Sequence, residues 1–231
     1  MHAVLRVLAQ DQRGSSQGGG DVLPQIHQVH ALPDLGGGYG IAYTGADPVP
    51  PSAAEVARAL ADAVRVTCAD LGDPVPRVSV EPGRSVIGPT TVTLYTVTGL
   101  KRVRLGGGAG RSYVSVDGGM SDNIRPALYD AAYTALLANR RPNPAAGLVR
   151  ARVVGKHCES GDVVVRDVDL PGDLATGDVL AVPATGAYGR SMASNYNLFT
   201  RPGVAWVDGG RQGWVLRPET IEDLLRLEGD A

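Results

Sequence analysis

The stretch "PSAAEVARALADAVRVTCADLGDPVPRVSVEPGRS" (residues 51–85) decides the fold, because it joins a helix to a short strand. Ser52 and Glu55 have the spacing of a capping box, in which each side chain bonds a free backbone N–H at the helix start. Apolar residues then recur at helical spacing: Val56, Leu60, Val64, Cys68 and Leu71. Val78 and Val80 alternate in the strand that follows. A helix followed by a strand is the repeating piece of a parallel sheet or barrel.

A glycine cluster precedes the helix in "HALPDLGGGYGIAY" (30–43), which reads as a short strand running into a loop. Glycines at a strand end let backbone N–H groups approach an oxyanion, although a plain tight turn has the same composition. "EPGR" (81–84) follows the next strand, and the carboxyl ends of strands are the functional ends in α/β barrels. A surface ion pair between Glu81 and Arg84 is the alternative interpretation.

Beyond residue 90 the chain alternates apolar and polar residues, as strands do. The expected strands are 90–103, 112–119, 147–158, 162–170 and 178–188, with a hairpin over 204–216 and helices over 124–137 and 218–228. The predicted fold is therefore an α/β segment followed by a mostly antiparallel β-barrel or sandwich. We expect three parts: a flexible segment over 1–30, the α/β segment over 31–88, and a β domain over 89–231.

Composition excludes several functional classes. The 231 residues are 43% hydrophobic, so a core can form, and the net charge of -2 provides no attraction to nucleic acid or to an anionic membrane. No apolar run approaches the roughly 18 residues of a membrane span. The two cysteines, Cys68 and Cys158, are too few for a disulfide scaffold. We expect a cytoplasmic protein in which Cys68 is a small core residue on the helix stripe.

"CESGD" (158–162) places a thiol beside a carboxylate, directly after Lys156 and His157. Adjacent residues on a strand point to opposite faces, so His157 and Cys158 are not expected to share a proton. The two cysteines and four histidines show no metal-ligand spacing, and no metal site is predicted. A catalytic thiol and a polar bend between strands both remain open on these residues alone.

Five stretches, taken in order, resemble the second half of the diaminopimelate decarboxylases. They are "DLGGGYGIAY" (34–43), "VEPGRSVIGPT" (80–90), "YVSVDGGMSDNIRPALYDAAY" (113–133), "VVGKHCESGDV" (153–163) and "GAYGRSMASNYN" (186–197). These are pyridoxal-phosphate enzymes of the alanine racemase and ornithine decarboxylase fold type. The resemblance implies that residues 31–88 are the last βα units of a (β/α)8 barrel. It implies that residues 89–231 are the β domain that completes the site across a dimer.

The resemblance also implies a cofactor site for pyridoxal 5'-phosphate. Gly37 and Gly38 would hold the cofactor phosphate through their backbone. Glu81 would face the pyridine nitrogen and keep it protonated, so that the ring works as an electron sink. Gly83 and Arg84 would hold the phosphate and a substrate carboxylate.

The substrate site implied by the resemblance lies in the β domain. Arg125 and Tyr129 would hold the far carboxylate and amine end of the substrate, and Tyr188 would contact phosphate and substrate. Cys158 would donate a proton to the decarboxylated carbanion, and Glu159 would bind the far ammonium, both in the partner subunit's site. Ornithine has no second carboxylate, so Arg125 favours diaminopimelate as the substrate.

The family's Schiff-base lysine lies in the N-terminal half of the barrel, and neither Lys101 nor Lys156 stands in that context. We therefore expect a truncated decarboxylase of meso-2,6-diaminopimelate, forming L-lysine, whose activity needs more than this chain. Cofactor binding by the chain alone is expected to be weak or absent. A second copy, or a lysine-bearing N-terminal half, is the expected partner. The alternative is a non-catalytic remnant, or an interaction module that dimerises through the β domain.

Overall fold

The computed structural model describes residues 33–104 and 110–229, and the segment predicted to be flexible, 1–30, lies outside them. The described residues divide into two compact units. One holds residues 33–41 and 49–85, and the other holds 42–48 and 86–229. No helix within these described ranges combines the length and apolar character that crossing a membrane requires.

The first unit is a strand–helix–strand segment. Its elements are β1 (Asp34–Gly37), α2 (Ala53–Leu71), β2 (Ser79–Glu81) and the start of α3 (Gly83–Ile87). β1 and β2 pair in parallel, as the predicted βα unit requires. β1 ends in Gly36 and Gly37, so the glycines lie at the end of this strand, as predicted. β2 is also shorter than the predicted strand, and Val78 and Val80 are both exposed.

The predicted capping box at the start of α2 is present, with reciprocal bonds between Ser52 and Glu55. The helix ends at Gly72, whose φ of 71° is in the left-handed region that glycine adopts at low cost. Val64 and Thr67 are the buried residues of the helix, and Cys68 is half-buried. The apolar stripe is therefore only partly covered within the described unit.

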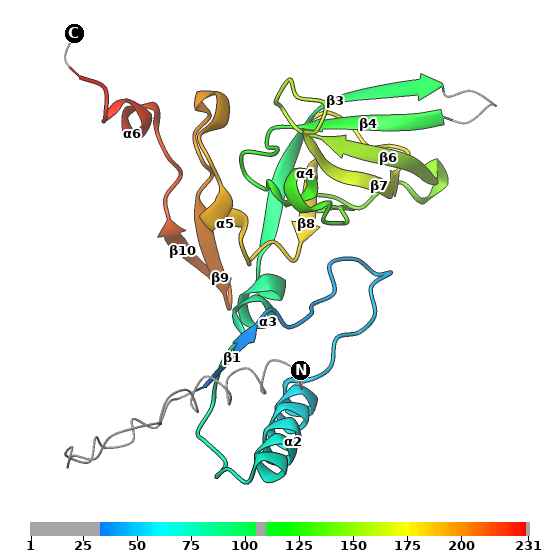
Figure 1. Cartoon of the computed structure of the whole chain (residues 1–231). Coiled ribbons are helices and arrows are strands. Elements are labelled where there is room, and N and C mark those ends of the chain that lie inside the picture. The colour runs from blue at the N-terminus through cyan, green and yellow to red at the C-terminus, as the bar shows by residue number, and fades with distance from the viewer. Residues whose placement is uncertain (1–32, 105–109, 230–231) are drawn as a thin grey trace. The chain divides into compact units, whose positions relative to one another are not determined.

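The second unit contains a six-stranded sheet of order β5-β8-β3-β4-β6-β7 (Figure 1). Its strands are β3 (Val92–Arg104), β4 (Gly110–Val116), β5 (Leu136–Leu137), β6 (Leu148–Val154), β7 (Val163–Pro171) and β8 (Val179–Pro183). All pairs are antiparallel except β4 with β6, which confirms the mostly antiparallel prediction. The end strands β5 and β7 contact each other, so the mixed sheet nearly closes on itself.

The core of this unit fills the inside of the sheet. Along β6 and β8 buried residues alternate with less buried ones, which is why these strands show a period of two in the sequence. In β7 the neighbouring Val164 and Val165 are both buried. The most completely buried side chains belong to five of these strands: Val97, Val114, Val116, Val153, Val164, Val165, Leu170, Leu180 and Val182. Aliphatic side chains therefore supply most of the core.

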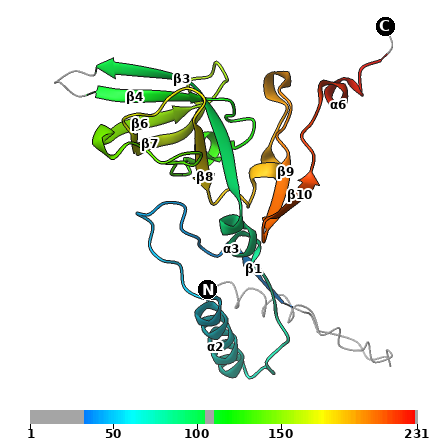
Figure 2. The same ribbon diagram turned by 180° about the vertical axis from the view of Figure 1, so that it is seen from behind.

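The predicted hairpin over 204–216 is confirmed as a separate two-stranded sheet of β9 (Val204–Asp208) and β10 (Arg211–Leu216), also visible from behind in Figure 2. Its turn residues Gly209 and Gly210 have φ values of 53° and 76°. Two consecutive residues with positive φ form the turn type that matches the twist of a hairpin, and glycine adopts it without strain.

The helix predicted over 124–137 is wrong in length. α4 spans only Arg125–Tyr129, because Asp130 has left-handed dihedral angles (φ 54°, ψ 28°) and Leu136–Leu137 then pair with β8. The closing helix predicted over 218–228 is also shorter, as α6 (Ile221–Leu225), with a capping box between Thr220 and Asp223. The remaining helical turns are α5 (Gly189–Met192), η1 (Gly88–Thr90), η3 (Pro144–Ala146) and η4 (Tyr196–Leu198).

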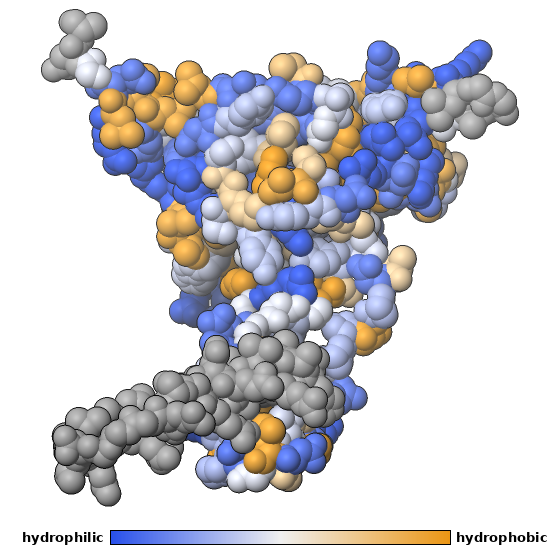
Figure 3. All heavy atoms as spheres, viewed as in Figure 1, coloured by the Kyte–Doolittle hydropathy of each residue, from blue (hydrophilic) through white to orange (hydrophobic). Residues whose placement is uncertain are grey.

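Apolar side chains are exposed on the hairpin and on α6. Figure 3 shows apolar surface in the region of α6. The exposed residues here include Val207, Trp214, Val215, Ile221, Leu225 and Leu227. An apolar surface of this kind is typical of an interaction site rather than of a freely hydrated face.

Candidate functional site

The glycine loop and the "EPGR" segment meet in the first unit. A side chain at Gly37 would overlap the backbone carbonyl of Glu81, so the pairing of β1 with β2 requires glycine there. Gly38 has a φ of 76°, and both it and Gly83 have open space where a Cβ would lie. Backbone at these two positions is therefore accessible to a ligand.

Arg84 connects the two segments. Its Nε donates a 2.9 Å hydrogen bond to the carbonyl of Tyr39, and its Nη2 donates to the carbonyl of Gly38. Glu81 is exposed at the end of β2. Within the described ranges Glu81 and Arg84 form no ion pair, so the structure does not support that alternative. Nη1 of Arg84 makes no hydrogen bond to the described residues, which leaves it available for an anion.

The second unit places the guanidinium of Arg125 among three tyrosine rings. Its carbon Cζ lies 4.9 Å from the ring centre of Tyr43, 5.9 Å from that of Tyr133 and 5.3 Å from that of Tyr188. Nη1 donates a 2.7 Å hydrogen bond to the hydroxyl of Tyr133. Burial raises the pKa of Tyr133, so this hydroxyl is neutral at pH 7 and leaves the cation uncompensated. None of the ion pairs among the described residues includes Arg125.

Tyr188 and Tyr129 differ in how the fold holds them. Tyr188 has left-handed dihedral angles (φ 70°, ψ -28°), a strained conformation for a residue with a side chain, and its ring faces Arg125. Tyr129 lies on α4 four residues after Arg125 and is 62% exposed. Only Tyr188 of this pair is in direct contact with the Arg125 side chain.

The "CESGD" segment is a turn between β6 and β7, built around the buried carboxylate of Asp162. That carboxylate accepts backbone N–H bonds from Met120 (2.6 Å) and His157 (2.8 Å). A Cβ at Gly119 or Gly155 would overlap the same carboxylate, so both glycines make room for it. The fold of this turn thus depends on the Asp162 side chain and two glycines.

His157 and Cys158 occupy opposite environments, although the segment is a turn and not the strand assumed in the sequence analysis. His157 is 8% exposed, and its ring Nε2 lies 2.9 Å from the hydroxyl of Ser121. The rings of Tyr196 and Phe199 pack against it at 5.4 and 5.2 Å. Cys158 is exposed. The histidine is therefore part of the support for the turn, and the thiol is accessible.

Glu159 is held by a residue from a distant part of the chain. The hydroxyl of Tyr196 donates a 2.6 Å hydrogen bond to Oε1 of Glu159, and Sγ of Cys158 lies 3.6 Å from the same oxygen. The bond from Tyr196 lowers the pKa of Glu159 and raises that of Tyr196. Glu159 is therefore ionised at neutral pH, beside an exposed thiol.

The structure thus forms three groups from the predicted site residues. Gly37, Gly38, Glu81, Gly83 and Arg84 lie in the first unit, whereas Arg125 with Tyr188, and Cys158 with Glu159, lie in the second. In the part of the chain that is described, no hydrogen bond, ion pair or ring contact joins Cys158 or Glu159 to Arg125.

Sequence reasoning missed three tyrosines in these groups: Tyr43 and Tyr133 beside Arg125, and Tyr196 beside Glu159. Each lies at or near the end of a stretch that carries the family resemblance, and that position was the available signal. The contacts of Tyr43 with Arg125 and of Tyr196 with Glu159 join residues far apart in the chain, which spacing within one motif does not reveal. Tyr133 lies in the same stretch as Arg125, where spacing alone does not show that the two side chains meet.

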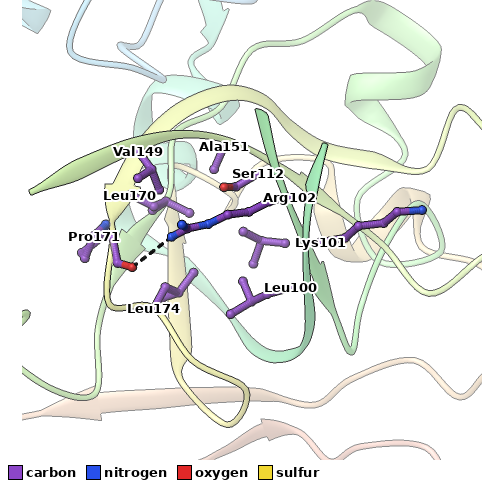
Figure 4. A pocket seen from close by; sticks show the side chains of 11 residues that line it. Leu100, Lys101, Arg102, Ser112, Val149, Ala151, Leu170, Pro171 and Leu174 are labelled. Atoms are coloured by element: carbon purple, nitrogen blue, oxygen red, sulfur yellow. Dashed lines mark hydrogen bonds between the residues drawn. The ribbon is translucent and has the colours of Figure 1, made fainter. Parts of the chain in front are cut away.

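A shallow hollow lies elsewhere, among β3, β4, β6 and β7 (Figure 4). Its lining is mostly aliphatic, and Arg102 reaches across it to the carbonyl of Gly172 at 3.5 Å, while Lys101 points away from the other labelled side chains. It contains none of the predicted site residues. No cluster of three or more metal-ligating side chains occurs among the residues that the structure describes.

The sequence that forms the nearly closed mixed sheet matches a known protein family. Residues 46–186 match the family described as pyridoxal-dependent decarboxylase, C-terminal sheet domain, and the chain belongs to this family. The chain is 48% identical over 225 residues to diaminopimelate decarboxylase of Corynebacterium efficiens, covering 94% of this chain and 48% of that protein. It is 50% identical over 209 residues to the Mycobacterium tuberculosis protein of the same name, covering 90% and 46%.

Solved structures agree with this assignment. The crystal structure of diaminopimelate decarboxylase from M. jannaschii in co-complex with L-lysine has a TM-score of 0.75 and 31% identity, covering 86% of this chain and 43% of that one. The Helicobacter pylori enzyme complexed with L-lysine has a TM-score of 0.70 and 30% identity, covering 84% and 44%. The chain spans about half the length of the curated relatives it matches.

Proposed function

We propose that this chain provides the C-terminal part of a decarboxylase that converts meso-2,6-diaminopimelate to L-lysine. The observation that carries the proposal is the Arg125 guanidinium, which lies among tyrosine rings and has no carboxylate partner among the described residues. A substrate carboxylate would neutralise this cation through two parallel hydrogen bonds. A diamino diacid carries such a group at its far end, and ornithine does not. The names of the relatives point to the same substrate.

In this proposal the remaining polar groups bind the rest of the substrate. Glu159 is ionised and half-buried, and it binds the far ammonium group. Tyr188 faces Arg125 and contacts both the substrate and the cofactor phosphate. Tyr129, one helical turn after Arg125, contacts the same end of the substrate. An ammonium and a carboxylate at one carbon are thus recognised by groups of opposite charge.

Cys158 is the proposed proton donor. Loss of CO2 leaves an electron pair on the α-carbon of the substrate, and one proton must be delivered there. The thiol is exposed at the tip of a turn whose base is held by Asp162, so it can reach a site that this turn does not itself form. A thiol carries a transferable proton and is therefore a suitable general acid for this step.

The first unit contains groups that fit pyridoxal 5'-phosphate. The open backbone at Gly38 and Gly83 suits a phosphate, as does the free Nη1 of Arg84, and Gly37 would add a backbone N–H. Arg84 would also hold a substrate carboxylate. The exposed carboxylate of Glu81 suits a pyridine N–H. When bound, the cofactor supplies an electron sink for the pair that loss of CO2 releases.

The domain assignment and the partner complete the proposal. Residues 31–88 are the last βα units of a (β/α)8 barrel, and residues 89–231 are a C-terminal β domain. Cys158 and Glu159 act in a neighbouring subunit's site, so the chain dimerises or assembles with a lysine-bearing N-terminal half. The exposed apolar residues of the hairpin and α6 support an assembly interface. Light scattering that finds only monomer at high concentration would contradict a homodimer.

Complementation tests this function. The chain is co-expressed with the lysine-bearing half of a related decarboxylase, and lysine formation from diaminopimelate is assayed. Cys158→Ala should lower turnover by about 10²-fold or more, on the scale of a lost general acid. Glu159→Gln should mainly raise KM. Cys68→Ala is the matched control, because Cys68 is half-buried on α2 in the other unit and should keep the activity.

Three outcomes would contradict parts of the proposal. Equal turnover of Cys158→Ala and the unchanged chain would remove the role of the thiol. If no lysine-bearing half restores activity, the remnant or interaction-module alternative is favoured. A borohydride-reduced cofactor adduct on Lys101 or Lys156 that accompanies turnover would show that the chain supplies its own lysine.

A further inference from the structure

We infer that Tyr196 is a positioning residue for Glu159: it holds one carboxylate oxygen so that the other is left for a ligand's ammonium group. The Tyr196 hydroxyl lies 2.6 Å from Oε1 of Glu159. Oε2 has no hydrogen-bond partner among the described residues, although it is buried. A buried carboxylate oxygen without a donor is rare, because its desolvation is uncompensated. The identity of the ligand rests on the proposed function, but the contact between the two side chains does not.

Tyr196 is itself held by groups on both sides, independently of Glu159. Nδ2 of Asn195 donates to the carbonyl of Phe199 (3.1 Å) and to Oε2 of Glu219 (2.7 Å). The backbone N–H of Ser194, two residues before Tyr196, donates a hydrogen bond to the carbonyl of Ser121 at 3.0 Å. The Tyr196 ring also packs on the buried His157 ring. The loop therefore brings the hydroxyl to a defined place, and Glu159 orients toward it.

The same contact sets the thiol beside a fixed charge. Oε1 of Glu159 lies 3.6 Å from Sγ of Cys158, so the oxygen that Tyr196 holds is also the one that contacts the thiol. Without the tyrosine hydroxyl, the carboxylate can rotate, and both the ammonium ligand and the thiol lose a fixed neighbour. The titratable groups that act on Glu159 are Tyr196, Cys158 and His157. Of these, only Tyr196 donates a short hydrogen bond to it.

The first test uses the chain by itself and needs no activity. Glutamate carboxyl carbons are labelled with ¹³C, and the resonance absent from Glu159→Gln identifies Glu159. In Tyr196→Phe the titration midpoint of Glu159 should rise toward the ordinary glutamate range. Tyr113→Phe is the matched control, since no hydrogen bond among the described residues involves the Tyr113 hydroxyl. An unchanged Glu159 midpoint in a folded Tyr196→Phe chain would overturn the inference.

The second test uses the complemented enzyme. Loss of an orienting hydrogen bond to a charged group should raise KM for diaminopimelate by about ten-fold in Tyr196→Phe, with a smaller change in kcat. A shifted Glu159 midpoint with an unchanged KM would overturn the positioning role. If the unchanged complemented enzyme makes no lysine, the proposed function fails. In that case the carboxyl titration still decides whether Tyr196 holds Glu159.

Discussion

Nη1 of Arg125 donates a 2.7 Å hydrogen bond to the hydroxyl of Tyr133, and the Tyr43 ring meets the Tyr133 ring edge-on at 5.3 Å. A cation is therefore held in place by aromatic groups and by no carboxylate among the described residues. Such an arrangement orients the guanidinium while leaving its charge for an anionic ligand.

Tyr133→Phe should loosen Arg125 while keeping the ring packing. The lost hydrogen bond to a charged group is expected to lower the free energy of unfolding by about 1–2 kcal/mol. Urea unfolding of the chain measures this change, with Tyr113→Phe as the control for losing a hydroxyl. In the complemented enzyme the same variant should raise KM for diaminopimelate. Unchanged stability together with unchanged KM would show that the hydrogen bond from Arg125 to Tyr133 does not orient the guanidinium.

The turn that carries Cys158 offers a matched pair of glycines. Gly155→Ala should destabilise the chain by more than about 2 kcal/mol, because the new methyl group overlaps the buried Asp162 carboxylate. Gly161→Ala should be close to neutral, since nothing lies within 4 Å of its Cβ position. Thermal or urea unfolding compares the two variants. Equal losses would mean that the Asp162 contact does not set the turn.

The close approach of β1 and β2 predicts a second glycine effect, in the first unit. Gly37→Ala should separate the strands, because its methyl group would overlap the backbone carbonyl of Glu81. Amide hydrogen exchange over Ser79–Glu81 should then become faster. Gly40→Ala, which has open space and ordinary dihedral angles, should leave the exchange unchanged. Protected amides in Gly37→Ala would refute the parallel pairing.

Glu219 should make stability depend on acid pH. The hydrogen bond from Arg201 is the main reason that the pKa of Glu219 falls from its ordinary 4.5 to about 2. A lowered folded-state pKa stabilises the fold above the unfolded value, and the contribution is lost as the pH falls from about 4.5 toward about 2.

The size of this acid effect is moderate. Arg201 keeps 32% of its side chain exposed, so we expect a contribution on the order of 1–2 kcal/mol after solvent screening. Glu219→Gln should flatten the dependence of unfolding free energy on pH in that window. Urea unfolding at a series of pH values measures it. Parallel curves for the two proteins would exclude Glu219 as the group responsible.

Sequence patterns correctly predicted the features that depend only on residues a few positions apart. The capping box of Ser52 and Glu55 and the Gly209-Gly210 turn are examples, since both depend on residues within a few positions. The ordered motifs also identified the family. The helix predicted over 124–137 is wrong in length because the apolar pattern of this segment resembles that of a helix, whereas α4 ends before the left-handed Asp130 and Leu136–Leu137 pair with β8.

The environment of each site residue was decided by the tertiary structure. Closure of the mixed sheet and its loops brings Tyr43, Tyr133 and Tyr188 around Arg125, and a loop after β8 brings Tyr196 to Glu159. The sequence by itself determined the family, the strand pattern and the residue types of the site. Only the folded chain determined which groups touch, because most of these contacts join positions tens of residues apart, and sheet pairing and loop packing set their distances.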